Sequence, residues 1–385
     1  MKLAFSLFGL FLAVQAGAAS LPAGLRLIET SPALAKAVAL RFPGEVRVLT
    51  ENVILVPAAL VPEISQVSHE TTGHCGGFMD ITDETGHKTS VRVTEALPSL
   101  GSKQPWIAEL IDDVRAPNVR DFVGAYSGNF KTRLASSPEG ASAPEWLRNA
   151  WENMARKAGR DDIKVETVPG PDGYAQKSVR ITIPGADPEL PVVVLGGHLD
   201  SINRRGSKVA PGADDDASGI AALTETFRVL LSSQARPKRT IEIFGYAAEE
   251  LGLLGSRVIA QHYQATGRKV RAVLQLDMVA YPSEAHAVTF ITDNVDRELT
   301  QWTEQLYGLY VGGDVKEDRC GYGCSDHASW TRYGYPSVMP FESPMGEMNH
   351  RIHTERDTWD ELLDADHAAK FVKLAVAFAA QLSGE

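Results

Sequence analysis

Apolar runs rich in β-branched residues alternate with helix-like segments between residues 165 and 340. The runs include SVRITIPG, PVVVLGGH, TIEIFGYA, RAVLQLDMVAY, AVTFITD and PSVMPFES, and the amphipathic stretch GIAALTETFRVLLSS separates two of them. Runs that are apolar throughout are typical of strands buried on both faces in a largely parallel sheet. The pattern therefore predicts an α/β fold with a mixed, largely parallel central sheet flanked by helices.

Two helix-like segments precede this region, PWIAELIDDV and APEWLRNAWENMARKAG. Proline favours the first turn of a helix, and glycine favours the position just after the last turn. We therefore expect the second helix to begin at Pro144 and to end at Gly159.

The segment from Ser20 to Pro98 has a different pattern. Short strand-like runs such as EVRVLTENVILVPA and TSVRVTEA are separated by turns rich in Gly, Pro and Thr. Such spacing is typical of a small domain, and the Gly and Ser residues in LPSLGSKQPW indicate a linker after it. We predict a small α+β domain over residues 20–98 and a larger domain over residues 99–385.

The first 19 residues have the three parts of a secretory signal peptide. Met1-Lys2 supplies the positive charge, residues 3–14 are apolar, and small residues follow. A membrane anchor is the alternative, but this run is shorter than the roughly 20 residues that span a bilayer. We predict cleavage near Ala18 or Ala19 and a secreted, soluble protein with no membrane partner.

The composition narrows the class of protein. Hydrophobic residues make up 44% of the 385 positions and charged residues 23%, as in ordinary globular proteins. The 38 basic and 49 acidic residues give a net charge of −11 at pH 7. An acidic surface repels phosphate backbones, so no nucleic-acid partner is expected.

The cysteines indicate a small disulfide loop. Cys320 and Cys324 lie in RCGYGCSDH, and an exported chain meets an oxidising environment. A zinc-binding or redox pair is the alternative, but redox motifs have two residues between the cysteines, and a structural zinc site needs a second pair. Cys75 is left over.

Polar residues that follow the apolar runs are the candidates for chemistry, because open α/β sheets bind ligands at the carboxyl ends of their strands. In VVVLGGHLDS, His198 and Asp200 are two residues apart and face the same side of an extended chain. The carboxylate can then accept the second ring N–H of the imidazole, as at many metal sites. A purely structural histidine is the alternative.

Carboxylates gather at two further places. Asp214, Asp215 and Asp216 precede a helix in APGADDDASG, and TIEIFGYAAEE ends in Glu249 and Glu250. Helix capping is the alternative for both sets. Three packed aspartates, however, need a compensating cation, and of two adjacent glutamates one is expected to bind a cation and the other to transfer protons.

Two more segments add possible ligands. Asp277 is the sole charge in the apolar run AVLQLDMVAY, where an unpaired carboxylate would be strongly destabilising. NHRIHTERDTWD contains His350 and His353, either of which can supply the last ligand. The H-E-x-x-H signature of helical zinc proteases does not occur.

Taken in order, GGHLDS, PGADDDASG, YAAEE, LQLDM, CGYGCSDH and RIHT resemble the motifs of the secreted bacterial leucyl aminopeptidases, exopeptidases with two zinc ions side by side. The resemblance extends from about Lys103 to the C-terminus. It implies that Glu249 is the general base. The metal ligands it implies are His198 and Asp277 at one zinc, Glu250 and His353 at the other, and Asp215 at both.

The resemblance implies further roles outside the ligand set. It assigns no ligand role to His327 or His350, which we assign to structure. The other implied features are Asp200 orienting His198, a disulfide between Cys320 and Cys324, Met278 and Tyr322 near the substrate pocket, and a cis peptide bond between Asp215 and Asp216.

Charge counting agrees with two zinc ions, because four positive charges against three carboxylates leave one charge for a hydroxide to balance. We expect Glu249 to take a proton from that water, the hydroxide to attack the zinc-polarised carbonyl, and Glu249 to pass the proton to the leaving amine. The predicted activity is removal of N-terminal residues from peptide substrates. Large apolar residues are favoured, and leucine is favoured by the resemblance alone.

Residues 20–98 match the pro-region of that family in position and size. We expect this segment to assist folding or to block the site within the same chain until it is removed, and the enzyme to be a monomer. The alternatives are a carboxypeptidase or a glutaminyl cyclase on the same scaffold, or an inactive binding domain. A cyclase of this kind would bind one zinc ion, and inactive domains usually lose ligands.

Overall fold

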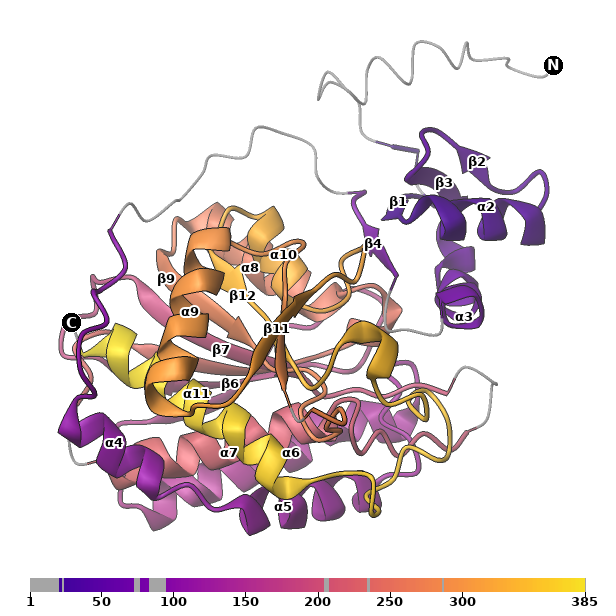
Figure 1. Ribbon diagram of the computed structural model, residues 1–385. Coiled ribbons are helices and arrows are strands. Elements are labelled where there is room, and N and C mark those ends of the chain that lie inside the picture. The colour runs from indigo at the N-terminus through magenta and orange to yellow at the C-terminus, as the bar shows by residue number, and fades with distance from the viewer. Residues whose placement is uncertain are drawn as a thin grey trace.

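The chain forms a small antiparallel sheet, then a six-stranded mixed sheet between helices (Figure 1). The structure is a computed structural model that describes residues 21–22, 24–72, 77–82, 95–203, 208–233, 236–285 and 287–384. The predicted signal peptide, Cys75 and residues 89–94 of the run TSVRVTEA lie outside these ranges. None of the helices in the described ranges has the length and apolar character that a bilayer crossing needs.

The first described part of the chain, residues 21–82, contains a four-stranded sheet in the order β2-β3-β1-β4. All its pairings are antiparallel, and side chains such as Ile28, Ile54 and Val56 form a small core with the helices. We refer to this part as the N-terminal unit. Its elements are β1 (Leu25–Thr30), α2 (Pro32–Arg41), β2 (Arg47–Val48), β3 (Val53–Pro57), η1 (Ala58–Leu60), α3 (Val61–Thr72) and β4 (Phe78–Asp80).

The central sheet has the order β12-β9-β7-β8-β6-β5. Neighbouring strands from β12 to β8 are parallel, whereas β6 and β5 are added antiparallel. The mixed, largely parallel sheet predicted from the apolar runs is therefore confirmed. Its strands are β5 (Lys164–Val168), β6 (Ser178–Ile183), β7 (Val192–His198), β8 (Ile241–Tyr246), β9 (Val270–Gln275) and β12 (Ser337–Val338).

Strand β7 illustrates why these runs are apolar throughout. Val193 and Leu195 belong to the large core formed with α5, α7 and α11, whereas Val192 and Val194 belong to a second core formed with α8 and α10. Both faces of the sheet are thus covered, and alternate side chains enter different cores. The helices of this region are α4 (Pro105–Asp112), α5 (Ala116–Asn129), α6 (Pro138–Lys157), α7 (Ala217–Ser232), α8 (Leu254–Thr266), α9 (Arg297–Tyr310), α10 (His327–Arg332) and α11 (Ala365–Ser383).

Helix α6 begins earlier than predicted. Ser137 caps it by accepting a hydrogen bond from Gly140 N–H, and Pro144 lies inside the helix. A proline in a helix leaves the carbonyl four residues earlier without its donor. Here Gln176 Nε2 donates to the Gly140 carbonyl at 2.9 Å, so a distant side chain supplies the missing hydrogen bond. The predicted end at Gly159, which has φ +68°, is confirmed.

A second, three-stranded sheet lies outside the central one. Strand β10 (Val288–Ile291) is in the middle, parallel to β11 (Val315–Asp318) and antiparallel to β13 (Pro340–Phe341). The last of these strands, β13, precedes the 3-10 turn η3 (Met345–Glu347), and the loop from η3 to α11 carries His353.

Candidate metal centre

Three predicted ligands and the predicted general base lie at or just after the carboxyl ends of parallel strands. His198 is the last residue of β7, and Asp277 follows the end of β9 by two residues. Glu249 and Glu250 open the 3-10 turn η2 (Glu249–Leu251), three residues after β8. Because parallel strands end at the same edge of the sheet, loops far apart in sequence meet there.

Three of the predicted ligands form one group. Nε2 of His198 is 3.0 Å from Oδ1 of Asp215 and 3.6 Å from Oδ1 of Asp277. One ligand atom from each of these residues lies within 4.8 Å of the other two. The first predicted ligand set is thus brought together.

Asp215 also belongs to the second group. Nε2 of His353 is 2.8 Å from Oδ2 of Asp215 and 3.3 Å from Oε2 of Glu250. The ligand atoms of these three residues again lie within 4.8 Å of one another. One carboxylate therefore presents a different oxygen to each group, which is the geometry of a bridging ligand.

The donor set fits divalent cations. All five side chains are at most 2% exposed, and neither oxygen of Asp277 has a hydrogen-bond partner among the described groups. Burying unpaired carboxylates is costly unless a cation compensates them. Imidazole nitrogens together with carboxylate oxygens are ligands that zinc takes in catalytic sites.

Glu249 lies beside these groups but belongs to neither. Its side chain is fully buried, and neither carboxylate oxygen has a hydrogen-bond partner among the described residues. Burial raises its pKa well above the usual value, and the charge of Glu250 raises it further. A carboxyl group with a raised pKa is suited to accepting and returning a proton near neutral pH.

The bridging position has the opposite electrostatic character. Burial opposes ionisation of Asp215, yet the hydrogen bonds from His198 and His353 outweigh burial and hold its pKa well below the usual range. Burial likewise disfavours the charged form of His353, but Glu250 and Asp215 raise its pKa to about 10. In the metal-free protein, protons bound by the histidines thus balance the charge of the buried carboxylates.

Asp200 contacts more than the histidine it was predicted to orient. Its Oδ1 lies 3.4 Å from Nδ1 of His198. Oδ1 also accepts the N–H of Glu249 at 3.0 Å, and Oδ2 accepts that of Glu250 at 3.3 Å. One buried carboxylate thus joins the end of β7 to the turn that carries the paired glutamates.

Asp216 caps α7 and joins two further loops. Oδ1 accepts the N–H of Gly219 at 2.8 Å and that of Met278 at 3.2 Å, and Oδ2 accepts the N–H of His198 at 3.0 Å. Capping therefore does account for Asp216, as the alternative interpretation of the three aspartates allowed. The peptide bond between Asp215 and Asp216 is cis, as the resemblance implied.

Non-glycine residues with left-handed backbone conformation cluster here. Ala248, Met278 and His353 have φ between 52° and 57°. Such conformations cost of order 1–3 kcal/mol each and persist where the surroundings enforce them. Ala248 precedes Glu249, Met278 follows Asp277, and His353 is itself a predicted ligand, so these conformations occur at the site.

Comparison with known proteins agrees with this geometry. Residues 178–379 match Peptidase family M28, and the chain is 38% identical over 322 residues to leucine aminopeptidase 1 of Coccidioides posadasii, with 80% of this chain and 82% of that one covered. The chain belongs to peptidase family M28. It is therefore a zinc-dependent peptidase, and the resemblance noted in the sequence is confirmed.

Solved structures extend the comparison. The aminopeptidase LapA of Legionella pneumophila is 30% identical and superposes with a TM-score of 0.79, covering 94% of this chain and 99% of LapA. The glutaminyl cyclase of Porphyromonas gingivalis, 18% identical, superposes with a TM-score of 0.55. The second similarity is one of fold alone.

The cysteine loop of this M28 peptidase lies next to the first ligand group. Cys320 and Cys324 form a disulfide with Cα atoms 6.1 Å apart, as predicted. Met278 and Tyr322 line a small cavity beside Asp277 together with the disulfide. Sequence reasoning missed the other lining residues, which lie near β13 and η3: Met339, Phe341, Met345 and Met348.

Two histidines lie outside both ligand groups. His327 is buried, its Nε2 is 3.4 Å from the carbonyl oxygen of Asp293, and burial lowers its pKa to about 4. His350 is exposed. Neither position contradicts the structural role assigned to these residues.

Sequence reasoning also missed the carboxylates behind Asp215. Asp357 accepts the backbone N–H groups of Asp214 and Asp215, and Glu342 accepts those of Tyr281 and Asn349. Asp357 follows His353 by only four residues, and this closeness was the feature of the sequence that could have identified it. Asp214, the first of the three aspartates, accepts from Asn349 Nδ2 at 2.9 Å.

The N-terminal unit contacts the turn that carries the glutamates. Oγ of Ser65, in α3, donates to the carbonyl oxygen of Glu250 at 2.7 Å. The ring of Phe78 lies so close to Gly252 that an added Cβ there would come within 2.6 Å of it. Met79 packs against Leu253. The N-terminal unit therefore lies directly on η2.

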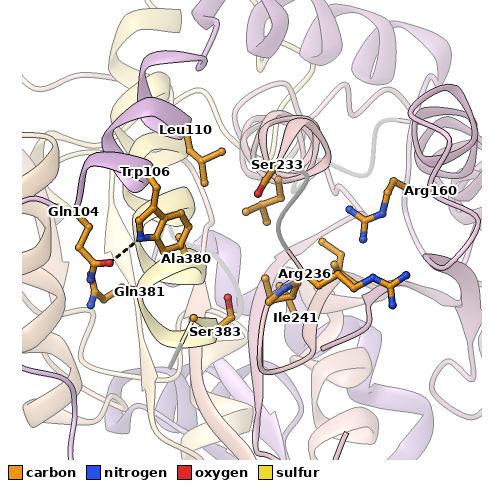
Figure 2. A pocket seen from close by; sticks show the side chains of 14 residues that line it. Gln104, Trp106, Leu110, Arg160, Ser233, Arg236, Ile241, Ala380, Gln381 and Ser383 are labelled. Atoms are coloured by element: carbon orange, nitrogen blue, oxygen red, sulfur yellow. Dashed lines mark hydrogen bonds between the residues drawn. The ribbon is translucent and has the colours of Figure 1, made fainter. Parts of the chain in front are cut away.

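A larger groove lies at the opposite edge of the central sheet (Figure 2). It has a volume of about 350 Å³ and lies among α4, the end of α7, the start of β8 and the end of α11. Its walls include Trp106, Leu110 and Ile241, with Arg160 and Arg236 nearby. None of the predicted site residues lines it.

Proposed function

We propose that this M28 peptidase is a secreted aminopeptidase that holds two zinc ions and removes large apolar residues, leucine among them, from the N-termini of peptides. The observation that carries the proposal is the position of Asp215, whose two oxygens face two separate groups of ligands. His198 and Asp277 would complete one zinc site, and Glu250 and His353 the other.

Bound zinc would polarise a peptide carbonyl and make water easier to deprotonate. Glu249 takes the proton of the attacking water and passes it to the leaving amine. Its raised pKa, which comes from burial and from Glu250, suits both transfers. Asp200 accepts the backbone N–H of Glu249 and so holds Glu249 in place. The same carboxylate lies beside Nδ1, the second ring nitrogen of His198.

Substrate preference is proposed to come from the cavity beside Asp277. Its lining is apolar and sulfur-rich, with Met278, Met339 and Phe341 around the disulfide and Tyr322. Thioether side chains adapt to apolar groups of different shape. The relatives named leucine aminopeptidase support leucine as a substrate residue.

The decisive experiment is hydrolysis of leucine p-nitroanilide by protein freed of metal with a chelator. We expect no activity without zinc, full recovery when zinc is added back, and saturation at two ions per chain. The matched control is N-acetyl-leucine p-nitroanilide, which lacks the free amine and should not be cleaved. Equal cleavage of both substrates would refute an aminopeptidase.

A glutaminyl cyclase remains the rival with the same fold. Saturation at a single zinc ion, with cyclisation of N-terminal glutamine and no release of leucine, would favour it. The higher identity to leucine aminopeptidase 1, 38% against 18% for the cyclase, supports the aminopeptidase. An inactive domain is disfavoured because all five ligands and Glu249 are present and buried.

The N-terminal unit is proposed to be part of a pro-region, residues 20–98, that inhibits the enzyme until it is removed. The contacts of Ser65 with Glu250 and of Phe78 with Gly252 support this role, because through them the N-terminal unit packs on η2, the turn that carries Glu249 and Glu250. Mass spectrometry of the secreted, active protein should find an N-terminus near residues 99–105. An N-terminus near residue 20 in a fully active monomer would contradict the proposal.

A further inference from the structure

Asp357 holds the backbone that leads into Asp215. Three consecutive N–H groups donate to it: that of Ala213 to the main-chain carbonyl at 3.1 Å, that of Asp214 to Oδ1 at 3.0 Å, and that of Asp215 to Oδ2 at 3.2 Å. Asp357 is only 1% exposed. It belongs to the loop that carries His353.

Similar arrangements join the other ligand loops. Asp200 takes the amides of the paired glutamates, and Asp216 takes those of His198 and Met278. In each case one buried carboxylate uses both oxygens to accept backbone N–H groups of other segments of the site: Asp200 from the turn η2, and Asp216 from the end of β7 and from the segment after β9. Asp357 supplies this connection for the loop of His353.

We propose that Asp357 is a positioning residue for the metal pair, which fixes Asp215 relative to His353 by holding their two loops together. The inference rests on the proposed two-zinc function. Asp215 has to present one oxygen to each ligand group, with the histidine nitrogens only 3.0 and 2.8 Å away. A small rotation of its backbone would misdirect both oxygens at once.

The chemistry of the contact requires a carboxylate. Each side-chain oxygen of Asp357 accepts a backbone N–H group. A carboxylate can do this because both of its oxygens are acceptors. Asparagine has nearly the same volume but places an N–H group against one of the two backbone N–H groups. Asp357→Asn therefore removes one hydrogen bond and adds a repulsive contact without opening a cavity.

Asp364→Asn is the matched control. Oδ1 of Asp364 accepts the N–H groups of Asp366 and His367 at 2.8 and 3.3 Å and caps α11. Both N–H groups donate to one oxygen, which asparagine keeps, and both belong to α11 and not to a ligand loop. This variant reports the effect on zinc binding of the same Asp-to-Asn change made outside the ligand loops.

The test measures zinc affinity by competition with a coloured chelator and stability by thermal unfolding, in the full chain. Changes next to metal ligands typically cost 10–100-fold in affinity or activity. We expect Asp357→Asn to weaken zinc binding by about that factor and Asp364→Asn to leave it unchanged. At saturating zinc, kcat of Asp357→Asn should return to within about threefold of the original, because the group touches no reacting atom.

Unchanged zinc affinity in Asp357→Asn, or a loss no larger than in Asp364→Asn, would overturn the inference. If Asp357→Asn does not fold, Asp357→Glu serves instead, since it keeps the charge but displaces both oxygens, and the same two outcomes decide. Zinc binding is read without a peptide substrate. A protein that binds zinc but cleaves no peptide would therefore refute the proposed function and leave this inference standing.

Discussion

The two edges of the central sheet are both hollowed, yet they differ in chemistry. At the carboxyl edge, four other buried predicted ligands surround Asp215, and the oxygens of Asp277 and Glu249 have no hydrogen-bond partner among the described residues. At the opposite edge the groove is larger, but Arg160 is paired with Asp162, and Arg236 is exposed. Desolvated and unsatisfied side chains, more than cavity size, mark the site of chemistry.

The largest expected effect is that of Glu249→Ala at the carboxyl edge. Loss of the proton carrier should lower kcat by about 10³-fold or more, while both metals remain because Glu249 is in neither ligand group. Steady-state kinetics with zinc analysis by mass spectrometry checks both parts. Undiminished kcat with full zinc content would remove Glu249 from the mechanism.

Asp215→Ala should abolish metal retention rather than chemistry alone. Both groups share this carboxylate, so its removal leaves His198 and His353 without their common partner. Zinc content after dialysis should fall well below two ions per chain, and excess zinc should restore little activity. Full stoichiometry in this variant would show that Asp215 does not bridge.

Metal removal should make stability strongly dependent on pH. Neighbouring charges outweigh burial and raise the pKa of His353 to about 10, and burial raises that of Glu250 to about 7. Both groups hold protons more tightly folded than unfolded, where their values are about 6.5 and 4.3. The stability of metal-free protein should therefore fall as pH rises from about 4.3 to about 10, through Glu250 in the lower part of this range and His353 in the upper part.

Thermal unfolding with and without chelator across this pH range tests whether the stability of the metal-free protein falls as pH rises. Zinc displaces the protons from the same ligands, so the gap in Tm between zinc-loaded and metal-free protein should widen as pH rises. A gap that narrows toward pH 9 would contradict the coupling between protons and metal at this edge.

The smallest effect is expected at the opposite edge. Trp106 is 40% exposed, and its indole N–H donates to Gln104 Oε1. Trp106→Ala should change kcat/KM by less than about twofold and stability by about 1 kcal/mol or less. A large loss of kcat/KM with an unchanged Tm would show that the two edges are coupled.

Much of the central sheet could be predicted because buried parallel strands are apolar on both faces. Val192 to Leu195 carried that signal, and the polar residues after each run marked the carboxyl edge. The start of α6 was missed because a side chain from a distant loop, Gln176, satisfies the carbonyl that Pro144 leaves unpaired. The sequence around Pro144 does not indicate a contact with a residue so far along the chain.

The sequence by itself indicated the candidate ligands, the position of several of them just after strands, and the disulfide loop, because periodicity and spacing are local properties of a chain. The resemblance implied that Asp215 serves both groups, and the tertiary structure brings one oxygen of Asp215 to each. Only the tertiary structure showed that Asp357 and Asp200 accept backbone N–H groups of the loops that carry predicted site residues, and that Ser65 reaches Glu250. These relations join loops separated by long stretches of sequence. Their distances are set by the packing of strands and helices, which determines where each loop meets the next.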